Sequence, residues 1–354
     1  MRINIILPFL PKVPGGGMKI MLEYANRLSA RGHDVIIYNV YNTKYLKHRL
    51  PQFVRTVIYN TIYAKYKPQW FRLDKNIETK NIPIIADKYI REANATISTN
   101  WISAFDLDKL DKTKGEKINL IQDYETWIGD TPNHIELLHE TYKLPVKQVV
   151  VSDYLVDIFE KYSKRKPYVL YNAIDNKIFK ITKPICERDN HTILMLFSEE
   201  ERKGVKYSIE AIKRCKKAIP DLKVGMFGVP ARPQYLEDWI EYYKQPEDLT
   251  SIYNNASIFL TSSIKEGWGL PACEAISCGC ALVCSDVEGH KVFAKHDLTA
   301  LLTKPKDVND ITEKLLRLLN DNTERIRIAR NGNDEIKKFS WDNSINKLLE
   351  IIND

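Results

Sequence analysis

Two glutamates, Glu266 and Glu274, stand eight residues apart in a segment whose residue types could bind a hydroxyl-rich ligand. An apolar run at residues 257–263 precedes the segment, and a second apolar run at residues 281–284 follows it. The order predicts a strand, a loop, a helix and another strand. The loop then lies at the carboxyl end of a strand, where open α/β sheets bind ligands. Since carboxylates accept hydrogen bonds from hydroxyl groups, ribose and hexose diols are suitable partners.

The spacing of the two glutamates differs from that of a hydrolytic acid/base couple. Eight helical residues span about 12 Å, whereas the paired carboxylates of glycosidases lie roughly 5–10 Å apart. We therefore expect Glu266 and Glu274 to contact the two ends of one extended ligand. The alternative is that both residues only stabilise a helix N-terminus electrostatically.

Glycine and proline mark the start of the helix between these glutamates. Gly267 and Gly269 allow the backbone to approach a ligand closely. Pro271 suits the first position of a helix, where its missing N–H costs nothing. The remaining free N–H groups favour a negatively charged group such as a diphosphate.

A basic pair, Arg202 and Lys203, follows another predicted strand at residues 192–197. Gly204 and a helix with apolar spacing come next, so the pair also lies at the carboxyl end of a strand. We expect Lys203 to neutralise a diphosphate and Arg202 to make bidentate contacts with it. The alternative is a basic pair exposed on the surface.

The amino-terminal part of the chain has its own polar turns after strands. Gly15-Gly16-Gly17 lies between a strand at residues 3–7 and a helix at residues 18–30, where it could direct backbone N–H groups at a ligand. A triple glycine alone suits a flexible turn equally well. Gln122 and Asp123 follow a later apolar strand; Gln122 can hydrogen-bond a sugar hydroxyl, and Asp123 can orient an acceptor. A polar turn that ends the strand is the alternative.

Strands and helices alternate along the whole chain, which predicts parallel sheets covered by helices. The strands fall into two series, so we expect two Rossmann-like domains, residues 1–172 and residues 173–338. A last helix at residues 339–354, with Ser340 as its N-cap, is expected to cross back onto the first domain. The predicted strands are residues 3–7, 35–38, 95–98, 118–121, 148–151 and 168–170, then 192–197, 223–227, 257–260, 281–284 and 300–303.

Length and composition fit two ordinary globular domains. The chain has 354 residues, 44% hydrophobic and 28% charged, which is close to globular averages. It contains no run of 18 apolar residues, and its first apolar run is too short for a signal peptide. We therefore expect a cytoplasmic protein. Asp106-Leu107-Asp108 has the spacing of a metal-binding pair but lies among alternating Asp and Lys, so we expect neither a metal nor a cofactor.

The segment at residues 41–80 is strongly basic, with nine Lys or Arg against two acids. After Pro51, helical spacing is kept by Phe53, Val54, Val57, Ile58 and Ile62, and tyrosines are interleaved with the charges. A basic amphipathic helix with aromatic residues is typical of an element that binds an anionic membrane surface. The alternative, given equal weight, is a solvated helix that covers the core of the first domain. We expect no nucleic acid partner, because no recognition motif accompanies the charge. The basic residues are Lys44, Lys47, Arg49, Arg55, Lys65, Lys67, Arg72, Lys75 and Lys80.

Glu266 and Glu274, with Gly-Trp-Gly-Leu-Pro between them and Cys278-Gly279 after them, resemble the signature of the retaining family 4 glycosyltransferases of the GT-B fold. The resemblance covers nearly the whole chain, because four more segments match markers of the family in the right order. These segments are Gly15–Gly17 with Leu28–Val35, Val151–Tyr154, Tyr171–Asp175 and Arg202–Gly204.

The resemblance implies an α/β protein of the GT-B fold, with two Rossmann-like domains facing each other across a cleft. It implies transfer of a sugar from a nucleotide-sugar donor to a glycan or lipid-linked acceptor, with retention of configuration and without a metal ion. A lipid-linked acceptor would place the protein peripherally on the inner face of the cell membrane. The expected catalytic residues are Lys203, Glu266, Gln122 and Asp123, and the expected donor-binding residues are Gly16, Gly17, Arg202, Lys203, Gly228, Glu266, Gly267, Trp268, Gly269, Leu270 and Glu274.

The chain departs from the family pattern at two places. Many relatives carry an arginine about five residues before the lysine, where this chain has Ser198, so Arg202 is expected to replace it. Relatives often have a histidine where this chain has Gln122 or Asp123, and the run Gln122–Glu125 is similar to some rhamnosyltransferases of the family. Other functions on the same fold are a nucleotide-sugar epimerase, a phosphorylase, or a catalytically silent homologue that binds sugars or membranes.

Overall fold

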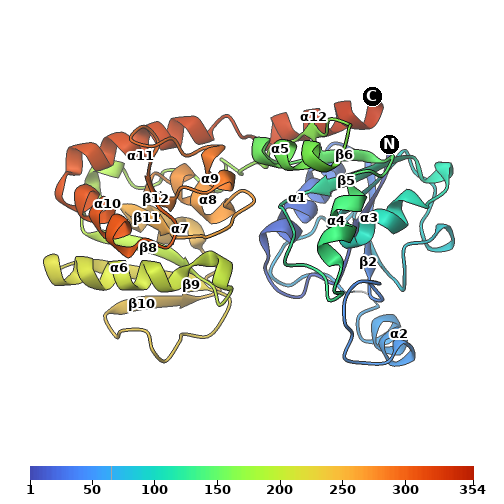
Figure 1. Cartoon of the computed structure of the whole chain (residues 1–354), viewed down its shortest axis with the longest axis horizontal. Coiled ribbons are helices and arrows are strands. Elements are labelled where there is room, and N and C mark those ends of the chain that lie inside the picture. Colours follow the sequence, from blue (N-terminus) through green and yellow to red (C-terminus); the bar gives the residue numbers. More distant parts are fainter. Residues whose placement is uncertain (65) are drawn as a thin grey trace. The chain divides into compact units, whose positions relative to one another are not determined.

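The computed structural model describes residues 1–64 and 66–354, so Lys65 of the basic segment lies outside the described residues. The chain divides into two units. Unit 1 comprises Met1–Asn172 and Asp342–Asp354, and unit 2 comprises Ala173–Trp341. Each unit is built on one parallel sheet with helices packed against it (Figure 1).

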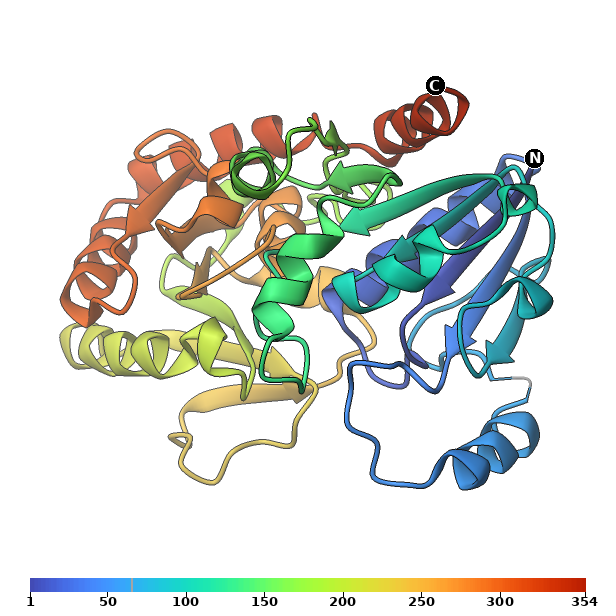
Figure 2. The same cartoon turned by 45° about the vertical axis from the view of Figure 1, so that its right-hand side comes forward.

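The sheet of unit 1 has seven strands in the order β3-β2-β1-β4-β5-β6-β7. The chain runs outward from β1 through β2 to β3 and then returns to the other side of β1 at β4 (Figure 2). The strand order therefore reverses between β1 and β4, and such a switch point opens a crevice at the carboxyl ends of the strands. The elements are β1 Arg2–Leu7, α1 Gly16–Ala30, β2 Asp34–Val40, α2 Gln52–Thr61, β3 Glu78–Ile82, β4 Ala95–Thr99, α3 Trp101–Asp108, β5 Glu116–Ile121, α4 His134–Thr141, β6 Lys147–Val150, α5 Asp153–Tyr162, β7 Tyr168–Val169 and α12 Trp341–Asn353.

The sheet of unit 2 has six strands in the order β10-β9-β8-β11-β12-β13. Its order reverses between β8 and β11, so this unit also has a switch point at the carboxyl ends of its central strands. The elements are β8 Thr192–Phe197, the 3-10 turn η4 Glu201–Lys203, α6 Val205–Ala218, β9 Lys223–Gly228, β10 Ile240–Lys244, α7 Leu249–Asn255, β11 Ile258–Thr261, α8 Leu270–Ser277, β12 Ala281–Ser285, α9 Glu288–Lys291, β13 Ala300–Thr303, α10 Val308–Asn320 and α11 Asn322–Ile336.

The central strands are apolar on both faces because helices cover both sides of a parallel sheet. In β1, Ile3, Ile5, Ile6 and Leu7 are fully buried. In unit 2, β8, β11 and β12 contribute to one core together with α6, α10 and α11. These continuous apolar runs are the feature that makes the central strands predictable from the sequence.

Two strands, β3 and β10, are absent from the sequence-based prediction. Each is an edge strand with a neighbour on one side only. Its residues are mostly half-buried or exposed, and a polar strand of this kind carries no apolar run. The prediction of the strand number was therefore too low by one in each sheet.

The last helix, α12, is attached to unit 1 by polar contacts along its length. The Arg31 guanidinium lies 3.1 Å from the Asp342 carboxylate, and Ser344 Oγ donates to the carbonyl of Tyr171 at 2.9 Å. Near the end of the helix, Lys147 Nζ donates to the carbonyl of Ile351. Among the helices of residues 1–64 and 66–354, none is long and apolar enough to cross a membrane.

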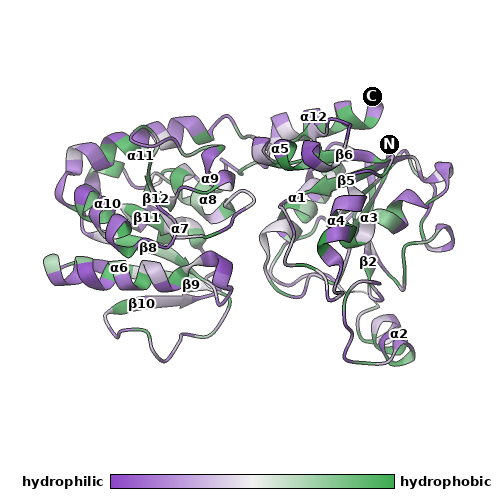
Figure 3. Ribbon diagram, in the orientation of Figure 1, coloured by the Kyte–Doolittle hydropathy of each residue, from purple (hydrophilic) through white to green (hydrophobic). Residues whose placement is uncertain are grey.

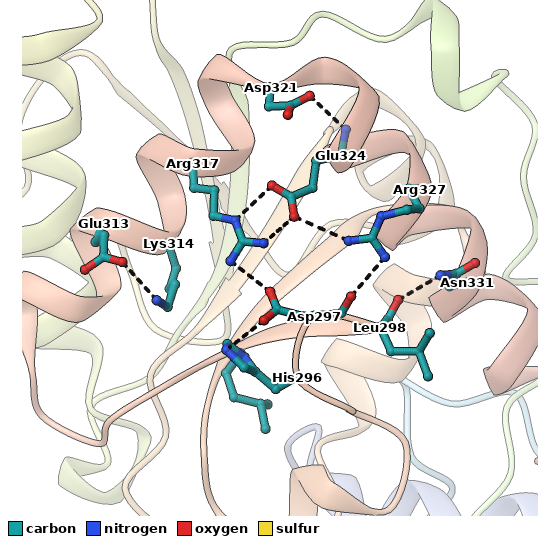
Figure 4. Close-up of polar contacts among 11 residues, drawn as sticks. His296, Asp297, Leu298, Glu313, Lys314, Arg317, Asp321, Glu324, Arg327 and Asn331 are labelled. Carbon is teal, nitrogen blue, oxygen red and sulfur yellow. Dashed lines mark hydrogen bonds and ion pairs between the residues drawn. The ribbon is translucent and has the colours of Figure 1, made fainter.

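A charged network fixes the junction of α10 and α11 in unit 2 (Figure 4). The Arg317 guanidinium donates two hydrogen bonds to the Glu324 carboxylate and lies 2.8 Å from an oxygen of Asp297. Arg327 reaches the carbonyl of the same Asp297 and also contacts Glu324. Because Glu324 is the most buried of these charges, the network holds both helices against the loop that precedes β13.

Candidate active site

The lysine that the sequence predicts at the diphosphate lies in a turn held against the end of β11. Gly204 follows Lys203 with φ +61°, and a Cβ there would lie 2.1 Å from the carbonyl oxygen of Ser262. Only glycine fits this position. Ser262 Oγ donates to the Gly204 carbonyl at 2.8 Å and accepts from Ser208 Oγ at 2.6 Å. These contacts fix the backbone that carries Lys203.

Lys203 forms an ion pair with the first of the two glutamates. Its Nζ lies 2.6 Å from Glu266 Oε2, and both side chains are largely buried, with 16% and 11% exposed. Ser263 Oγ donates to the same oxygen at 3.0 Å. Burial is the largest single influence and would raise the pKa of Glu266, but Lys203, His290 and Arg202 together lower it to about 2. Glu266 is therefore ionised over the whole physiological range.

His290 lies beside this ion pair and was missed by the sequence analysis. Its Nδ1 lies 2.9 Å from the carbonyl of Ser285, which can only accept, so Nδ1 carries the proton. Nε2 is then an acceptor, and it is buried without a partner in the described part of the chain. Burial lowers the pKa of His290, which favours this neutral form. The position of His290, just after the carboxyl end of β12, is the sequence signal that could have identified it.

Two glycines allow the close packing of this site. A Cβ on Gly269, at φ +97°, would lie 2.9 Å from the His290 ring, and a Cβ on Gly289 would lie 2.1 Å from the Glu266 carbonyl oxygen. A cavity of about 20 Å³, lined by Lys203, Glu266, Gly269 and His290 among others, has room for about one water molecule. The site thus offers a cation, a carboxylate and an unpaired ring nitrogen within one small region.

The second glutamate points into a different environment. Glu274 is 4% exposed, and its Oε2 accepts from the hydroxyl of Tyr253 on α7 at 3.0 Å. Burial raises the pKa of Tyr253 well above its ordinary value, and the Glu274 carboxylate acts in the same direction. The tyrosine therefore stays protonated and donates its hydroxyl hydrogen to Glu274.

Among the remaining residues of unit 2 that were predicted to bind the donor, Trp268 has its side chain in the core. Trp268 is buried, and its ring packs 5.1 Å from Phe339 and 6.0 Å from Phe293. Its side chain therefore belongs to the core, which leaves its backbone as the part that could meet a ligand. Gly267 precedes Trp268 in the loop, and Leu270 is the first residue of α8. Gly228 is the last residue of β9. The Arg202 guanidinium donates to the Glu200 carboxylate at 2.6 Å.

In unit 1, the glycine run and Gln122 are brought together. Helix α1 begins at Gly16, so the N–H groups of its first turn lack intrahelical acceptors. Gln122 Nε2 donates to the Gly17 carbonyl at 3.1 Å and to Thr99 Oγ1 at 2.8 Å. The three glycines at 15–17 do not have positive φ. A Cβ on Gly17 would lie 3.4 Å from Gln122 Oε1, an ordinary contact, so the contact with Gln122 does not require glycine.

Asp123 and Glu125 lie in the same turn but have different partners. Asp123 Oδ1 accepts from the Tyr154 hydroxyl and from the Tyr124 N–H, both at 2.8 Å. Glu125 is buried and accepts from the N–H of Trp101 at the start of α3, at 3.0 Å. Burial raises the pKa of Glu125 to about 8, although the N–H of Trp101 opposes the shift. Glu125 therefore holds the start of α3 as a mostly protonated acid at neutral pH.

We expect Glu125→Gln to remove a pH dependence of stability. The folded pKa of about 8 lies above the ordinary value of 4.5, so stability falls as pH rises between these values, where the unfolded state loses the proton first. The amide cannot ionise but can still accept from Trp101. At pH 8 the variant should be more stable than the wild type by at least about 1 kcal/mol, since one pKa unit corresponds to about 1.4 kcal/mol. Urea unfolding at pH 5, 6.5 and 8 measures this, with the exposed Glu116→Gln as control. Parallel profiles for wild type and variant would contradict the expectation.

Within residues 1–64 and 66–354, no group of three or more His, Cys, Asp or Glu is arranged to hold a metal ion. Asp106 and Asp108 both belong to the last turn of α3. The Asp106 carboxylate, 26% exposed, lies 3.5 Å from the Lys109 ammonium.

Unit 2 matches a known protein family, and the chain is similar to several known proteins. Residues 179–335, which lie within unit 2, match the family described as glycosyl transferases group 1. An uncharacterized glycosyltransferase of Methanocaldococcus jannaschii is 27% identical over 218 residues, covering 59% of this chain and 60% of that protein. The O-antigen chain mannosyltransferase B of Escherichia coli is 38% identical over 115 residues, covering 32% of this chain and 30% of that protein. The chain thus aligns with less than two thirds of the length of either of these relatives.

Among solved structures, the Anabaena protein HepE in complex with UDP-glucose has a TM-score of 0.73 to this chain at 13% identity, and the match covers 99% of both chains. This likeness extends over both units and concerns the fold. It confirms the predicted architecture of two Rossmann-like units, each with a parallel sheet, known as GT-B.

Proposed function

Because this chain belongs to the glycosyltransferases of the GT-B fold, we propose that it transfers a sugar from a nucleotide-sugar donor to a glycan or lipid-linked acceptor, with retention of configuration. The observation that carries the proposal is the buried pair of Lys203 and Glu266 at the carboxyl end of the unit 2 sheet. A nucleotide sugar carries negatively charged phosphates, which a cation binds, and hydroxyl groups, which donate to a carboxylate. Lys203 and Glu266 supply this cation and this carboxylate in one place.

The diphosphate is assigned to Lys203. When the glycosidic bond breaks, negative charge grows on the leaving diphosphate, and a fixed ammonium stabilises that charge more than it stabilises the bound substrate. Glu266 orients Lys203 at 2.6 Å before the donor arrives, so little reorganisation is needed. The N-terminus of α8, which begins at Leu270, adds backbone N–H groups for the same anion.

We assign the sugar hydroxyls to Glu266 and the ribose to Glu274. Glu266 is already held by Lys203 and Ser263, an arrangement that suits hydrogen bonding better than nucleophilic attack. Retention without a covalent nucleophile implies attack of the acceptor on the same face that the diphosphate leaves. The leaving diphosphate would then take the proton of the acceptor hydroxyl, and Lys203 and Arg202 would supply the positive charge, so that no metal ion is required.

The comparisons support a donor of this class. The Anabaena structure contains UDP-glucose, and the Escherichia coli relative is named a mannosyltransferase of O-antigen chains. In unit 1, Gln122 and Asp123 are proposed to meet the acceptor. A lipid-linked acceptor would bring the protein to the inner face of the cell membrane, and residues 41–80 are the segment expected to contact that surface.

We expect the two glutamates to have separable effects. Glu274→Gln should chiefly weaken binding of the nucleotide, and Glu266→Gln should chiefly slow sugar transfer, because one carboxylate contacts the ribose and the other the sugar. Isothermal titration with nucleoside diphosphate and initial rates of transfer measure the two effects. Tyr253→Phe is the control for Glu274, since it removes only the hydroxyl that donates to that carboxylate. Equal binding of nucleoside diphosphate by wild type and Glu274→Gln would refute the ribose assignment.

The test of the function is turnover with nucleotide sugars in the presence and absence of acceptor. Transfer to a glycan or lipid-linked acceptor supports the proposal. A product formed from donor alone would favour an epimerase, and binding without turnover would favour a silent homologue.

A further inference from the structure

The helix α2 of unit 1 presents apolar side chains to solvent. None of its residues is buried. Phe53 and Val57 lie one turn apart and are 73% and 59% exposed, and Leu50 and Ile62 at either end are 46% and 74% exposed. These four residues are called the α2 surface. Figure 3 shows hydrophobic residues on this helix, which projects from the rest of unit 1. An exposed cluster of large apolar residues commonly marks a binding surface.

The opposite side of α2 is fixed to the sheet, so the exposure is not a sign of a detached helix. The Tyr59 ring stacks on the Tyr41 ring with centroids 4.8 Å apart. Asn81 Nδ2, from β3, donates to the carbonyl of Tyr59 at 3.0 Å, and Arg55 Nη1 donates to the carbonyl of Tyr41 at 3.0 Å. The α2 surface is therefore presented outward by a packed helix.

These contacts correct the sequence-based interpretation of the interleaved aromatic residues. The Lys12 ammonium lies 3.9 Å from the centroid of the Tyr63 ring. The Tyr66 hydroxyl and the indole N–H of Trp70 both donate to the carbonyl of Pro11. These aromatic side chains attach the segment to the loop after β1 and do not form an outward face. Within the described part of residues 41–80, the large apolar side chains that remain exposed are those of the α2 surface.

The charge around the α2 surface selects the kind of partner. Residues 41–73 contain seven Lys or Arg and no Asp or Glu. Lys44, Lys47 and Arg49, just before the helix, are exposed. The Asp130 carboxylate, from elsewhere in unit 1, accepts a hydrogen bond from the N–H of Lys47. An apolar centre with a basic border matches the acyl boundary and the anionic headgroups of a bilayer, whereas a second copy of this positive surface would be repelled.

The position of α2 in the fold relates this surface to the proposed acceptor side. Helix α2 follows β2, and the glycine run at 15–17 follows the neighbouring strand β1. Because the strands are parallel, both connections leave the same edge of the sheet. A bilayer at the α2 surface would thus lie on the side of unit 1 where Gly17 and Gln122 meet.

We propose that the α2 surface is a membrane-insertion site, which places Phe53 and Val57 in the acyl boundary of an anionic bilayer while Lys44, Lys47 and Arg49 contact the headgroup phosphates. The membrane contact stands on exposure and charge alone. Its role in presenting a lipid-linked acceptor rests on the proposed function.

Sedimentation of the full chain with vesicles tests the insertion. One vesicle type is phosphatidylcholine alone, and the other contains about one third phosphatidylglycerol. Wild type should bind the anionic vesicles and bind them more weakly at high salt, because surface charges are screened over about 8 Å at physiological ionic strength. Phe53→Ser/Val57→Ser should weaken the partition at least about tenfold at every salt concentration, since burial of an apolar side chain is not screened. Lys47→Gln/Arg49→Gln should weaken it about tenfold at low salt and little at high salt.

The matched control is Ile178→Ser/Leu298→Ser, which removes two apolar side chains of unit 2 that are 54% and 49% exposed. This control should bind vesicles as the wild type does. Unchanged binding by Phe53→Ser/Val57→Ser, or wild type that ignores anionic vesicles at low salt, would overturn the proposal. A wild-type dimer that Phe53→Ser/Val57→Ser converts to monomer would instead identify an interface between two copies, and would also overturn it.

The same variants separate this proposal from the proposed function. Stabilisation by nucleotide sugars should be equal in wild type and Phe53→Ser/Val57→Ser, because α2 belongs to unit 1 and the pair of Lys203 and Glu266 to unit 2. Vesicle binding without any response to nucleotide sugars would refute the function and leave the insertion site in place.

Discussion

Lys203→Ala is expected to lower kcat by about 10²–10³, which corresponds to about 2.7–4 kcal/mol of lost transition-state stabilisation. The ammonium is the cation that lies against Glu266, and it is held there at 2.6 Å. Its removal also leaves the buried Glu266 carboxylate without its main counter-charge. Burial would then raise the pKa of Glu266 from its value of about 2, so the acid limb of the pH–rate profile should move to higher pH. Initial rates of sugar transfer between pH 4 and 8 measure both effects.

A neighbouring lysine provides the control for this change. Lys206, at the start of α6, is 64% exposed and lies 3.6 Å from Glu201. Lys206→Ala should leave kcat and its pH profile unchanged, since a solvated pair contributes little. Near-normal turnover by Lys203→Ala, with native circular dichroism, would show that Lys203 does not stabilise the leaving group.

Gly204→Ala is expected to have the largest effect on unit 2. The position has φ +61°, and the added Cβ would lie 2.1 Å from the Ser262 carbonyl oxygen. The left-handed conformation costs about 1–2 kcal/mol for a residue other than glycine. The clash adds about 1–3 kcal/mol, because the end of β11 cannot shift without breaking its hydrogen bonds. We expect a loss of about 2–5 kcal/mol in unfolding free energy and a displaced Lys203. Urea unfolding and titration with nucleoside diphosphate measure the two consequences.

Gly32→Ala is the control that measures the conformational cost without a clash, so the difference between the two variants gives the steric part. Gly32 has φ +82°, but a Cβ there would meet nothing within 4 Å. This control should lose only the conformational contribution and retain nucleotide binding. If both variants lose the same stability and both still bind nucleotide, the contact between Gly204 and Ser262 does not fix the position of Lys203.

The sequence predicts the central strands better than the sheet edges. The runs at residues 3–7 and 281–284 are apolar because both faces of β1 and β12 are covered. The edge strands β3 and β10 escape prediction, because one unpaired side and exposed residues leave them polar. The pattern of apolar residues in a sequence reflects which residues are buried. Because β3 and β10 are only partly buried, they carry no such pattern.

In the candidate site, local backbone features are predictable from the sequence, whereas contacts between distant residues are not. Gly204, Gly269 and Pro271 predict where helices begin, because these residue types are adapted to such backbone positions. That Lys203 lies against Glu266, 63 residues later, follows from the neighbouring positions of β8 and β11 in the sheet. The position of His290 after β12 indicates that it lies near the site, but this position does not tell a ligand-facing ring from a core ring. Its unpaired Nε2 becomes visible only when α9 is packed against Gly269.

In the basic segment at residues 41–80, residues that look alike in the sequence have different surroundings in the structure. The sequence presents tyrosines and aliphatic residues as equivalent apolar positions. In the structure, the Tyr66 hydroxyl has its partner in the loop after β1, and the Tyr59 ring has its partner just after β2. Phe53 and Val57 have no such polar group to anchor them and remain outside. The choice depends on contacts between distant parts of the chain, which periodicity does not encode.

The most direct test of the donor site is the thermal stability of the full chain with a panel of UDP-, GDP-, ADP- and dTDP-sugars. Wild type should be stabilised by at least one of these donors, because a ligand that binds only the folded state raises Tm by mass action. Lys203→Ala and Glu266→Gln should lose most of that shift, while Lys206→Ala should keep it. A wild type that responds to none of the donors, or a shift of equal size in Lys203→Ala and Glu266→Gln, would contradict a nucleotide-sugar site at Lys203 and Glu266.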